Sequence, residues 1–368
     1  MATVPTRPWG PSLVVLAAVT GVAVSTIYLP QPLLTDFISQ LGASTGAASS
    51  IATAVQLGTR SVAAGFFVVG LVANIAQLII PTAVRLAPHE AKHSTTSALV
   101  GSLLIGIFGG RVVAGLLGTL VGWRGVLLLF ALLVLVCLPL LRRVVPARMD
   151  VADRTAYHRI LLSTVRRLAT NRVLLESAIM QLLGFAAFNA VWTVMVLHLT
   201  GPALRWSPAA AGLFGLVGLA AGVVTLASAR AVQRLGSART VTLSIVVLLV
   251  ALLSVVVDNR LIWLFVPSMF LLTWANQLLQ SANQGRVLLA NQGGAAQANT
   301  MFMTAVFLGG SLGAALGPVA FQSDGMTGVA ELGLVLVALS GVTWLLASLV
   351  RRRAARRSPT GTSVTAGA

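Results

Sequence analysis

Ten stretches of about 20 apolar residues constrain this chain more than any other feature of its sequence. The hydrocarbon core of a bilayer is about 30 Å thick, and a helix needs about 20 apolar residues to cross it. We predict spans at residues 10–33, 61–83, 97–120, 123–141, 174–199, 208–229, 240–257, 261–284, 300–320 and 328–350. Only 9% of the residues are charged, against about 25% in soluble domains. The sequence therefore predicts an all-α, polytopic membrane helix bundle with about 10 transmembrane helices.

The basic residues are concentrated on alternate loops. Of the 25 lysines and arginines, 20 share the side of the N-terminus, and only Arg124, Arg205 and Arg260 lie on the opposite loops. The acidic residues show no such bias. Because cytoplasmic loops carry an excess of Lys and Arg, we predict a multi-pass protein of the inner (plasma) membrane, with both termini in the cytoplasm and an even number of crossings.

The net charge of +17 is spread over several cytoplasmic segments beside helix ends. Contact with anionic lipid headgroups explains this distribution, so we predict a lipid partner and no nucleic-acid partner. The single cysteine, Cys137, lies within a predicted span, which excludes a disulfide framework. We also expect a monomer without a cofactor.

The longest cytoplasmic connection, residues 144–172, divides the chain into two parts. Residues 1–143 would form a shortened N-terminal half with about four crossings, and residues 173–350 a C-terminal half with six. Within the connection, apolar residues recur at helical spacing from Ile160 to Leu168, which predicts a helix along the inner membrane surface. Residues 351–368 are basic and then rich in small polar residues, which predicts a disordered tail.

Five short segments resemble the major facilitator superfamily, in particular one of its efflux-type branches. They are residues 27–34 (IYLPQPLL), 55–58 (VQLG), 122–124 (GWR), 185–193 (FAAFNAVWT) and 299–310 (NTMFMTAVFLGG). The resemblance covers most of residues 10–350. It implies two related helix bundles around a central site, which would bind a small-molecule substrate and expose it alternately to either side of the membrane.

The chain departs from this family pattern after Gly58. By the same comparison, about 40 residues are missing, equivalent to the second half of the second helix and to the third helix. Read as one helix, residues 45–83 would be about 58 Å long, which is nearly twice the bilayer core. We therefore expect a break at Gly58, with residues 45–57 re-entrant or interfacial and Arg60 at the outer surface.

A polar helix face in the span 261–284 is the main candidate for a substrate pathway. Its members recur at intervals of three and four residues, which places them on one face: Thr273, Asn276, Gln277, Gln280, Asn283 and Gln284. Uncharged amides at membrane depth face protein or a water-filled cavity. The face would therefore line a substrate pathway, or its amides would instead hydrogen-bond neighbouring helices.

Further candidates for the pathway are Tyr28, Gln31, Asn189 and Trp192, for which the family resemblance implies cavity-lining positions. Trp192 could equally be a packing aromatic. Arg111 is the one clear cation within a span, and an intramembrane charge is a functional hypothesis by default. The alternative is an arginine that is satisfied by a backbone carbonyl or by a helix end.

Glycines line two of the predicted spans and predict close approach of other helices. One run comprises Gly106, Gly110, Gly115, Gly118 and Gly122, and the other comprises Gly309, Gly313 and Gly317. The first run resembles the fifth-helix motif of antiporters, but Arg111 stands where that motif prefers proline.

Residues 89–93 (HEAKH) fit the H-E-x-x-H pattern of zinc proteases. His89 and His93 could bind zinc, with Glu90 as general base, if a third protein ligand were present. Pro88 and the cap-like residues 94–96 (STT) instead place the segment in a short cytoplasmic loop. A zinc metalloprotease is therefore the least favoured function, and we predict no metal site and no catalytic residues.

These observations favour a secondary transporter of small solutes, working by alternating access and in the direction of efflux. The rival hypothesis is a shortened membrane protein that has lost transport. Glu176 lies four residues after Arg172, a spacing that predicts an ion pair on the helix surface. The predicted spans hold no deep Asp or Glu, so the sequence gives no support for proton coupling.

Overall fold

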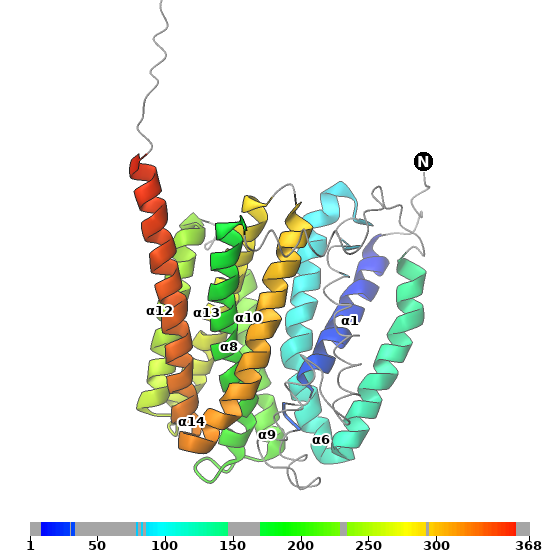
Figure 1. Ribbon diagram of the computed structural model, residues 1–368. Coiled ribbons are helices and arrows are strands. Elements are labelled where there is room, and N and C mark those ends of the chain that lie inside the picture. Colours follow the sequence, from blue (N-terminus) through cyan, green and yellow to red (C-terminus); the bar gives the residue numbers. More distant parts are fainter. Residues whose placement is uncertain are drawn as a thin grey trace, which may run out of the picture.

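The computed structural model describes residues 9–29, 31–33, 79, 82–83, 86–145, 170–228, 234–291 and 294–357. Within these ranges the chain is helical and has no strand. The elements are α1 (Trp9–Tyr28), η1 (His89–Ala91), α6 (Lys92–Val144), α8 (Arg172–Thr200), α9 (Pro208–Leu213), α10 (Gly215–Ala227), α12 (Ser237–Val257), α13 (Ile262–Ala290) and α14 (Ala295–Arg357). The long helices run side by side as one bundle, which confirms the predicted fold class (Figure 1).

The number of helices differs from the prediction. Seven helices in the described part are long and apolar enough to cross a membrane, fewer than the ten spans predicted. The predicted spans 97–120 and 123–141 are one element, α6, and the spans 300–320 and 328–350 are one element, α14. The predicted span 61–83 lies almost entirely outside the described residues.

Both of these long elements reverse direction. At 1.5 Å per residue, straight helices with the 53 residues of α6 and the 63 residues of α14 would be about 80 Å and 95 Å long. Non-helical backbone interrupts α6 at Gly122 (φ 68°), and α14 at Asp324 and Gly325 (φ 56°). A positive φ suits glycine, which lacks a Cβ. Each element therefore folds back and crosses the bundle twice (Figure 1).

Local sequence explains where several helices begin. The Asn171 side chain accepts a hydrogen bond from the backbone N–H of Leu174 and caps α8. Ser207 caps α9 in the same way, and Pro208 occupies the first helical position, where its missing N–H has no cost. On the loop before α13, the Asp258 carboxylate accepts the backbone N–H groups of Arg260 and Leu261.

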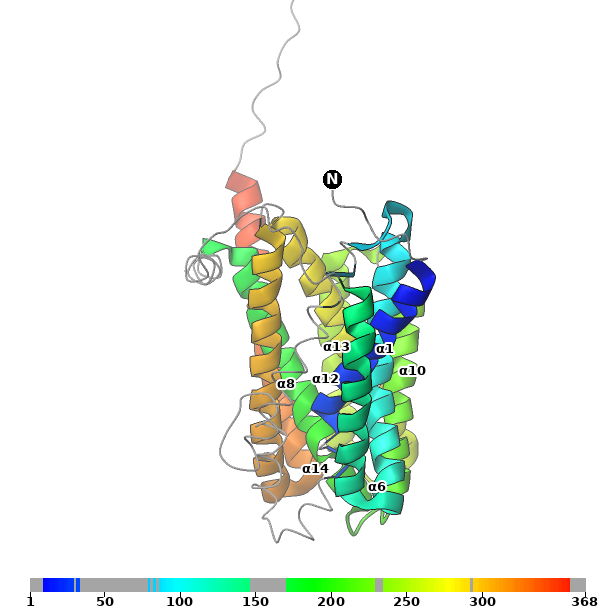
Figure 2. The same cartoon turned by 90° about the vertical axis from the view of Figure 1, so that its right-hand side faces the viewer.

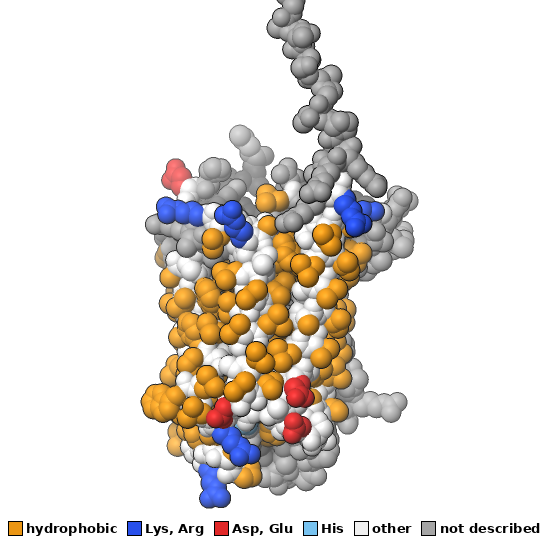
Figure 3. Space-filling view, turned by 90° about the vertical axis from the view of Figure 1, so that its left-hand side faces the viewer, with side chains coloured by type: hydrophobic (Ala, Val, Ile, Leu, Met, Phe, Trp, Pro, Cys, Tyr) orange, Lys and Arg blue, Asp and Glu red, His pale blue; other side chains and the backbone are white. Residues whose placement is uncertain are grey.

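The surface between the two ends of the bundle is apolar. Many leucines and valines are more than half exposed, including Leu120 on α6 and Val250 on α12. Figure 3 shows such side chains as a continuous band, with the charged side chains toward the two ends. Trp263, at the start of α13, is 84% exposed, as suits an aromatic residue at the membrane interface.

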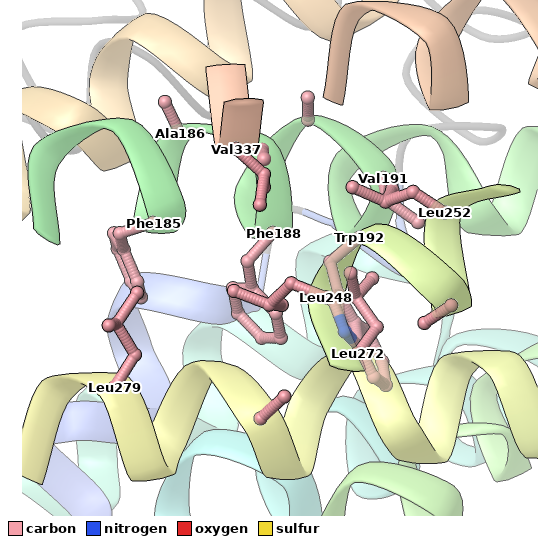
Figure 4. Close-up of a cluster of buried hydrophobic side chains, with 14 of the residues drawn as sticks. Phe185, Ala186, Phe188, Val191, Trp192, Leu248, Leu252, Leu272, Leu279 and Val337 are labelled. Atoms are coloured by element: carbon pink, nitrogen blue, oxygen red, sulfur yellow. The ribbon is translucent and has the colours of Figure 1, made fainter. Parts of the chain in front are cut away.

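The C-terminal half has its core around α8. Phe188 and Trp192 of α8 lie among Leu248, Leu272 and Val337, which come from α12, α13 and α14 (Figure 4). On another side of α8, glycines bring α14 into backbone contact. A Cβ added at Gly313 would lie 2.1 Å from the carbonyl oxygen of Ala186. The predicted close approach at Gly309, Gly313 and Gly317 is thus confirmed.

In the N-terminal half, the first glycine run packs against α1. Added Cβ atoms at Gly106 and Gly110 would meet Gly21 and Ser25, respectively, at less than 3 Å. Gly115, one turn further along α6, lies instead against Gly212 of α9. The run therefore contacts helices of both halves.

We call the contact of α6 with α9 and α10 the interhalf seam. An added Cβ at Gly115 would lie 2.6 Å from the Gly212 Cα, and one at Gly218 would lie 2.2 Å from the Phe108 ring. Nearer the cytoplasmic end predicted from the charges, Gly222 packs on Leu104. Figure 2 shows α1 and α6 on one side of the bundle and α8 and α14 on the other.

Several predictions fall outside the described residues. They include the break at Gly58, the placement of residues 45–57 and Arg60, and the surface helix of residues 160–168. The predicted disordered tail is wrong at its start, because α14 continues through Arg357. The arginines after Val350 extend the last helix by about two turns.

Candidate functional site

Arg111 is the centre of a buried polar group between the two halves. It lies near the middle of the first arm of α6, between Lys92 and the turn at Gly122, and is only 2% exposed. Its Nε donates a hydrogen bond to Gln31 Oε1 (2.8 Å), and its NH1 donates to the carbonyl of Ile107 (3.0 Å). Its NH2 has no hydrogen-bond partner among the residues that the structure describes. The backbone carbonyl expected as the alternative is present, but it satisfies only part of the guanidinium.

Three aromatic rings surround the same guanidinium. The ring centroids of Tyr28, Trp192 and Phe108 lie 4.4, 4.9 and 5.2 Å from the Arg111 Cζ. Aromatic faces attract cations, and more strongly where water is excluded. Phe108 was not among the candidates from the sequence. Its position three residues before Arg111 on one helix was the signal that could have identified it.

Amide side chains join this group to the C-terminal half. The Nε2 of Gln31 faces the Oδ1 of Asn189 at 3.5 Å, and Asn189 Nδ2 donates to the carbonyl of Gly310 (2.6 Å). Gln31 is 3% exposed and Asn189 is fully buried. A continuous polar path therefore runs from α6, through the residues after α1, to α8 and α14.

Trp192 connects the group to α13. Its indole N–H donates to Thr273 Oγ1 (3.2 Å), and both residues are fully buried. Its ring centroid lies 5.4 Å from that of Phe108 and 6.5 Å from that of Phe214. Trp192 is therefore a packing residue and also part of the cluster around Arg111. We call this cluster the Arg111 group; it consists of Tyr28, Gln31, Phe108, Arg111, Asn189 and Trp192.

A small cavity lies next to this group. Its lining comes from both halves and consists of Gln31, Pro32, Arg111, Trp192, Met195, Val196, Ala211, Gly212 and Gly215. The volume is about 10 Å³, the room that one water molecule needs. In this conformation the two halves are thus closed around the guanidinium.

The polar face of α13 extends away from Arg111. Gln284 donates to Asn299 of α14 (2.8 Å), and Asn283 accepts from Arg286 (3.1 Å). Gln277 and Gln280 are half-buried. From Thr273 to Gln284 the helix rises about 16 Å. The structure therefore brings Tyr28, Gln31, Arg111, Asn189 and Trp192 together, whereas Gln277, Gln280, Asn283 and Gln284 form a separate line.

Buried polar atoms without a partner among the described residues accompany this line. They are the Asn276 Oδ1 and Asn283 Nδ2 of α13, and the Ser177 Oγ and both amide atoms of Gln181 on α8. Unsatisfied buried polar groups are costly and uncommon. The part of α13 that follows Thr273 is thus more polar than contacts within the described helices require.

An ionic cluster lies at the end of the bundle where α8 begins. Glu176 pairs with Arg286 of α13 and with Arg351 of α14, and both guanidinium groups stack on Trp344. The predicted pairing of Glu176 with Arg172 is therefore wrong. Helix packing places two other cations against the carboxylate, which local spacing along α8 could not reveal.

The H-E-x-x-H segment does not lie on one α-helix. The residues from His89 to Ala91 form the 3-10 helix η1, and α6 starts only at Lys92. The described side chains contain no group of three His, Cys, Asp or Glu residues that could hold a metal ion.

The sequence of the chain matches proteins that are named as transporters over most of its length. It is 26% identical to “Uncharacterized transporter YgaY” of Escherichia coli O157:H7, over 93% of this chain and 97% of the relative. It is 29% identical to “Probable transporter SCO4007” of Streptomyces coelicolor, over 86% of this chain and 83% of the relative.

Solved transporter structures share the fold. A crystal structure of a variant of the nucleoside transporter NupG matches with a TM-score of 0.58 and 17% identity, over 91% of this chain and 90% of that one. An auto-inhibited peptide transporter of the POT family matches with a TM-score of 0.60 and 13% identity, over 97% and 99% of the two chains. The sequence model of the Major Facilitator Superfamily matches residues 7–314. The chain therefore belongs to the Major Facilitator Superfamily and is a membrane transporter rather than an enzyme.

Proposed function

We propose that the chain exports a small solute across the cytoplasmic membrane, binding it at the Arg111 group and exposing that group to the two sides in turn. The observation that carries this proposal is the buried contact of polar residues from both halves. Gln31 and Arg111 belong to one half, and Asn189 and Trp192 to the other. A site built from both halves is altered whenever the halves move relative to one another.

The interhalf seam supports such a movement. Its helices touch through glycine and through the flat face of an aromatic ring, at Gly115, Gly212 and Gly218. Surfaces of this kind present few side chains that would have to pass one another when helices slide or tilt. We propose that α6 rocks against α9 and α10 during transport.

We propose that the polar line of α13 forms the cytoplasmic part of the pathway. It starts at Thr273, which bonds Trp192, and continues through Asn276 to Asn283 beside the ionic cluster. The unpartnered amide atoms on this line suit groups that a passing solute or water contacts in turn.

The orientation proposed from the basic loops has further support. The described chain starts at Trp9 and ends at Arg357 at the same end of the bundle (Figure 1). The ends of α6 and α14 nearest to it carry Arg142, Arg143 and Arg351. We therefore propose that this end faces the cytoplasm and contacts anionic lipids, and that the protein acts as a monomer. The direction of transport is proposed from the resemblance of residues 27–34 to an efflux-type branch.

Solute flux in proteoliposomes tests the proposal. The purified chain would be reconstituted in a known orientation and screened with a library of radiolabelled solutes, including organic anions, lipophilic cations, sugars and amino acids. We expect flux of at least one class, faster from the cytoplasmic face, and at least tenfold slower in Asn189→Ala.

The matched control is Asn259→Ala. This asparagine also bonds a backbone carbonyl, that of Val255, and a neighbouring helix through Thr327, but it lies on the loop after α12, away from the site. Its substitution should leave flux within about twofold of the unaltered chain. If folded, unaltered protein moved no member of the library, the chain would instead be the transport-inactive membrane protein that its shortened N-terminal half suggests.

A further inference from the structure

The charge of Arg111 has no counterpart among the described residues. The ion pairs of the described part all involve Glu176, at the far end of α8. The described residues that line the cavity beside Arg111 include no Asp or Glu. A cation at membrane depth is costly unless it is compensated. Three aromatic rings and two acceptor oxygens reduce this cost, but they do not neutralise the charge.

The guanidinium also retains donors for another partner. Nε and one N–H of NH1 are used by Gln31 and Ile107, whereas NH2, although buried, has no acceptor in the described part of the chain. A guanidinium edge with two adjacent N–H groups matches the two oxygens of a carboxylate. NH2 and the second N–H of NH1 are not used by Gln31 or Ile107, so this edge of Arg111 has donors for one acidic group.

We propose that the transported solute is a small organic monocarboxylate whose carboxylate binds the NH2 edge of Arg111. This proposal rests on the proposed transport function and names its substrate class. Charge balance favours a monovalent anion, because Arg111 is the single cation among the described residues of the cavity lining, and their other polar member, Gln31, is neutral. A phosphate ester, with up to two negative charges, would leave excess charge in the membrane.

The rest of the lining defines the body of the solute. Trp192, Met195, Val196 and Ala211 offer apolar and aromatic surface, so the carboxylate would be attached to an aliphatic or aromatic group. The cavity of about 10 Å³ is too small for such a molecule. The solute therefore binds when the halves separate at this level, and Arg111 returns to its rings and to Gln31 after release.

Three probes of nearly equal shape and different charge test this inference. Benzoate, benzamide and benzamidinium would be titrated by calorimetry into the full chain in nanodiscs, in a chloride-free buffer at neutral pH. We expect benzoate to bind at least tenfold more tightly than benzamide, and benzamidinium not to bind, because hydrogen bonds between charged groups are worth more than neutral ones. Equal affinities, or no binding of benzoate, would overturn the proposal.

Variants assign the preference to Arg111. Arg111→Gln should remove the preference for benzoate over benzamide, and Arg111→Lys should retain part of it. The control is Arg124→Gln, since Arg124 also stacks on an aromatic ring of α6 (4.2 Å from Trp123) but is exposed beyond the turn. A preference that persists in Arg111→Gln would contradict the assignment. If Arg111→Gln does not fold, the affinities of the three probes for the unaltered chain and for Arg111→Lys test the assignment.

The outcomes separate this inference from the proposed function. Charge-selective binding without flux of any carboxylate would support an anion site at Arg111 and refute the proposal that the chain transports such an anion. Flux of neutral or cationic solutes, without preference for benzoate, would retain transport and refute the monocarboxylate. Competition by inorganic phosphate as strong as that by benzoate would show an inorganic-anion site and overturn the proposed substrate class.

Discussion

Replacing Gly313 by alanine tests the tightest helix contact of the C-terminal half. The added methyl carbon would lie 2.1 Å from the carbonyl oxygen of Ala186 and 2.9 Å from the backbone nitrogen of Ala190. These neighbours are backbone atoms of α8, so no side chain can rotate away. Since carbon and oxygen normally stay more than 3 Å apart, the two helices would have to separate by about 1 Å. Overpacking of this kind costs about 1–3 kcal/mol.

Gly313→Ala also gains helix propensity, worth about 1 kcal/mol, so the net destabilisation expected is up to about 2 kcal/mol. In a unit of 150–250 residues, 1 kcal/mol shifts Tm by about 2–4 °C. Thermal unfolding of the detergent-solubilised protein, followed by tryptophan fluorescence, would measure the shift. The control is Gly285→Ala on α13, where the added methyl meets nothing within 4 Å and Tm should stay equal or rise. A Tm of Gly313→Ala at or above that of Gly285→Ala would refute this view of the contact.

Three further predictions concern the ionic cluster, the loop before α13 and the interhalf seam. Glu176→Gln leaves two guanidinium groups without their carboxylate, and it should lower the free energy of unfolding by about 1–3 kcal/mol, measured by thermal unfolding. Arg351→Gln should lower it by less than about 1 kcal/mol, because the Arg351 side chain is 42% exposed. Two backbone N–H groups hold the pKa of Asp258 below its usual value. The stabilisation by its charge should therefore be complete above the unfolded-state pKa of about 4 and should disappear as the pH falls through the lower folded-state pKa. The difference in Tm between the unaltered protein and Asp258→Ala should therefore shrink in acid. A difference that does not depend on pH would argue against this cap. Gly115→Ala should slow solute flux several-fold, because its methyl carbon would lie 2.6 Å from the Gly212 Cα of α9. The control is Gly101→Ala on the same seam, whose methyl would make an ordinary contact of 3.8 Å with Leu226 and which should transport normally. Equal flux in the two variants would contradict rocking at the seam.

Hydropathy alone predicted the positions of the long helices that the structure describes, although the predicted span 208–229 is divided into α9 and α10. The predicted span 174–199 corresponds to α8 (Arg172–Thr200), and the span 240–257 to α12 (Ser237–Val257). Membrane depth fixes the length of such segments, so their ends can be read from the sequence. The family resemblance implied a tight turn at residues 122–124, and the structure has that turn at Gly122. The sequence also separated the spans 300–320 and 328–350, but it did not predict that the turn between them is confined to Asp324 and Gly325.

The candidate site was predictable only in part. The five residues that meet around the guanidinium were named from the family resemblance and from the rarity of an intramembrane arginine, but their mutual contacts depend on how two halves pack. The predicted partner of Glu176, Arg172, was wrong for the same reason. Arg286 and Arg351 are more than 100 residues away in sequence, and the carboxylate reaches them through the packing of three helices. The regular spacing of the α13 amides correctly placed them on one helix, but it could not show that they lead away from Arg111.

Alternating exposure of the cavity between the halves is the central claim, and cysteine labelling tests it most directly. Met195 lines this cavity and is 2% exposed, so Met195→Cys in a Cys137→Ser background places one thiol beside the site. Membrane-impermeant thiol reagents would be added to one face at a time in oriented proteoliposomes. Our account predicts labelling from either face, slowed from both when the halves are locked together by cross-linking. Labelling of folded protein from one face only, or from neither, would contradict it.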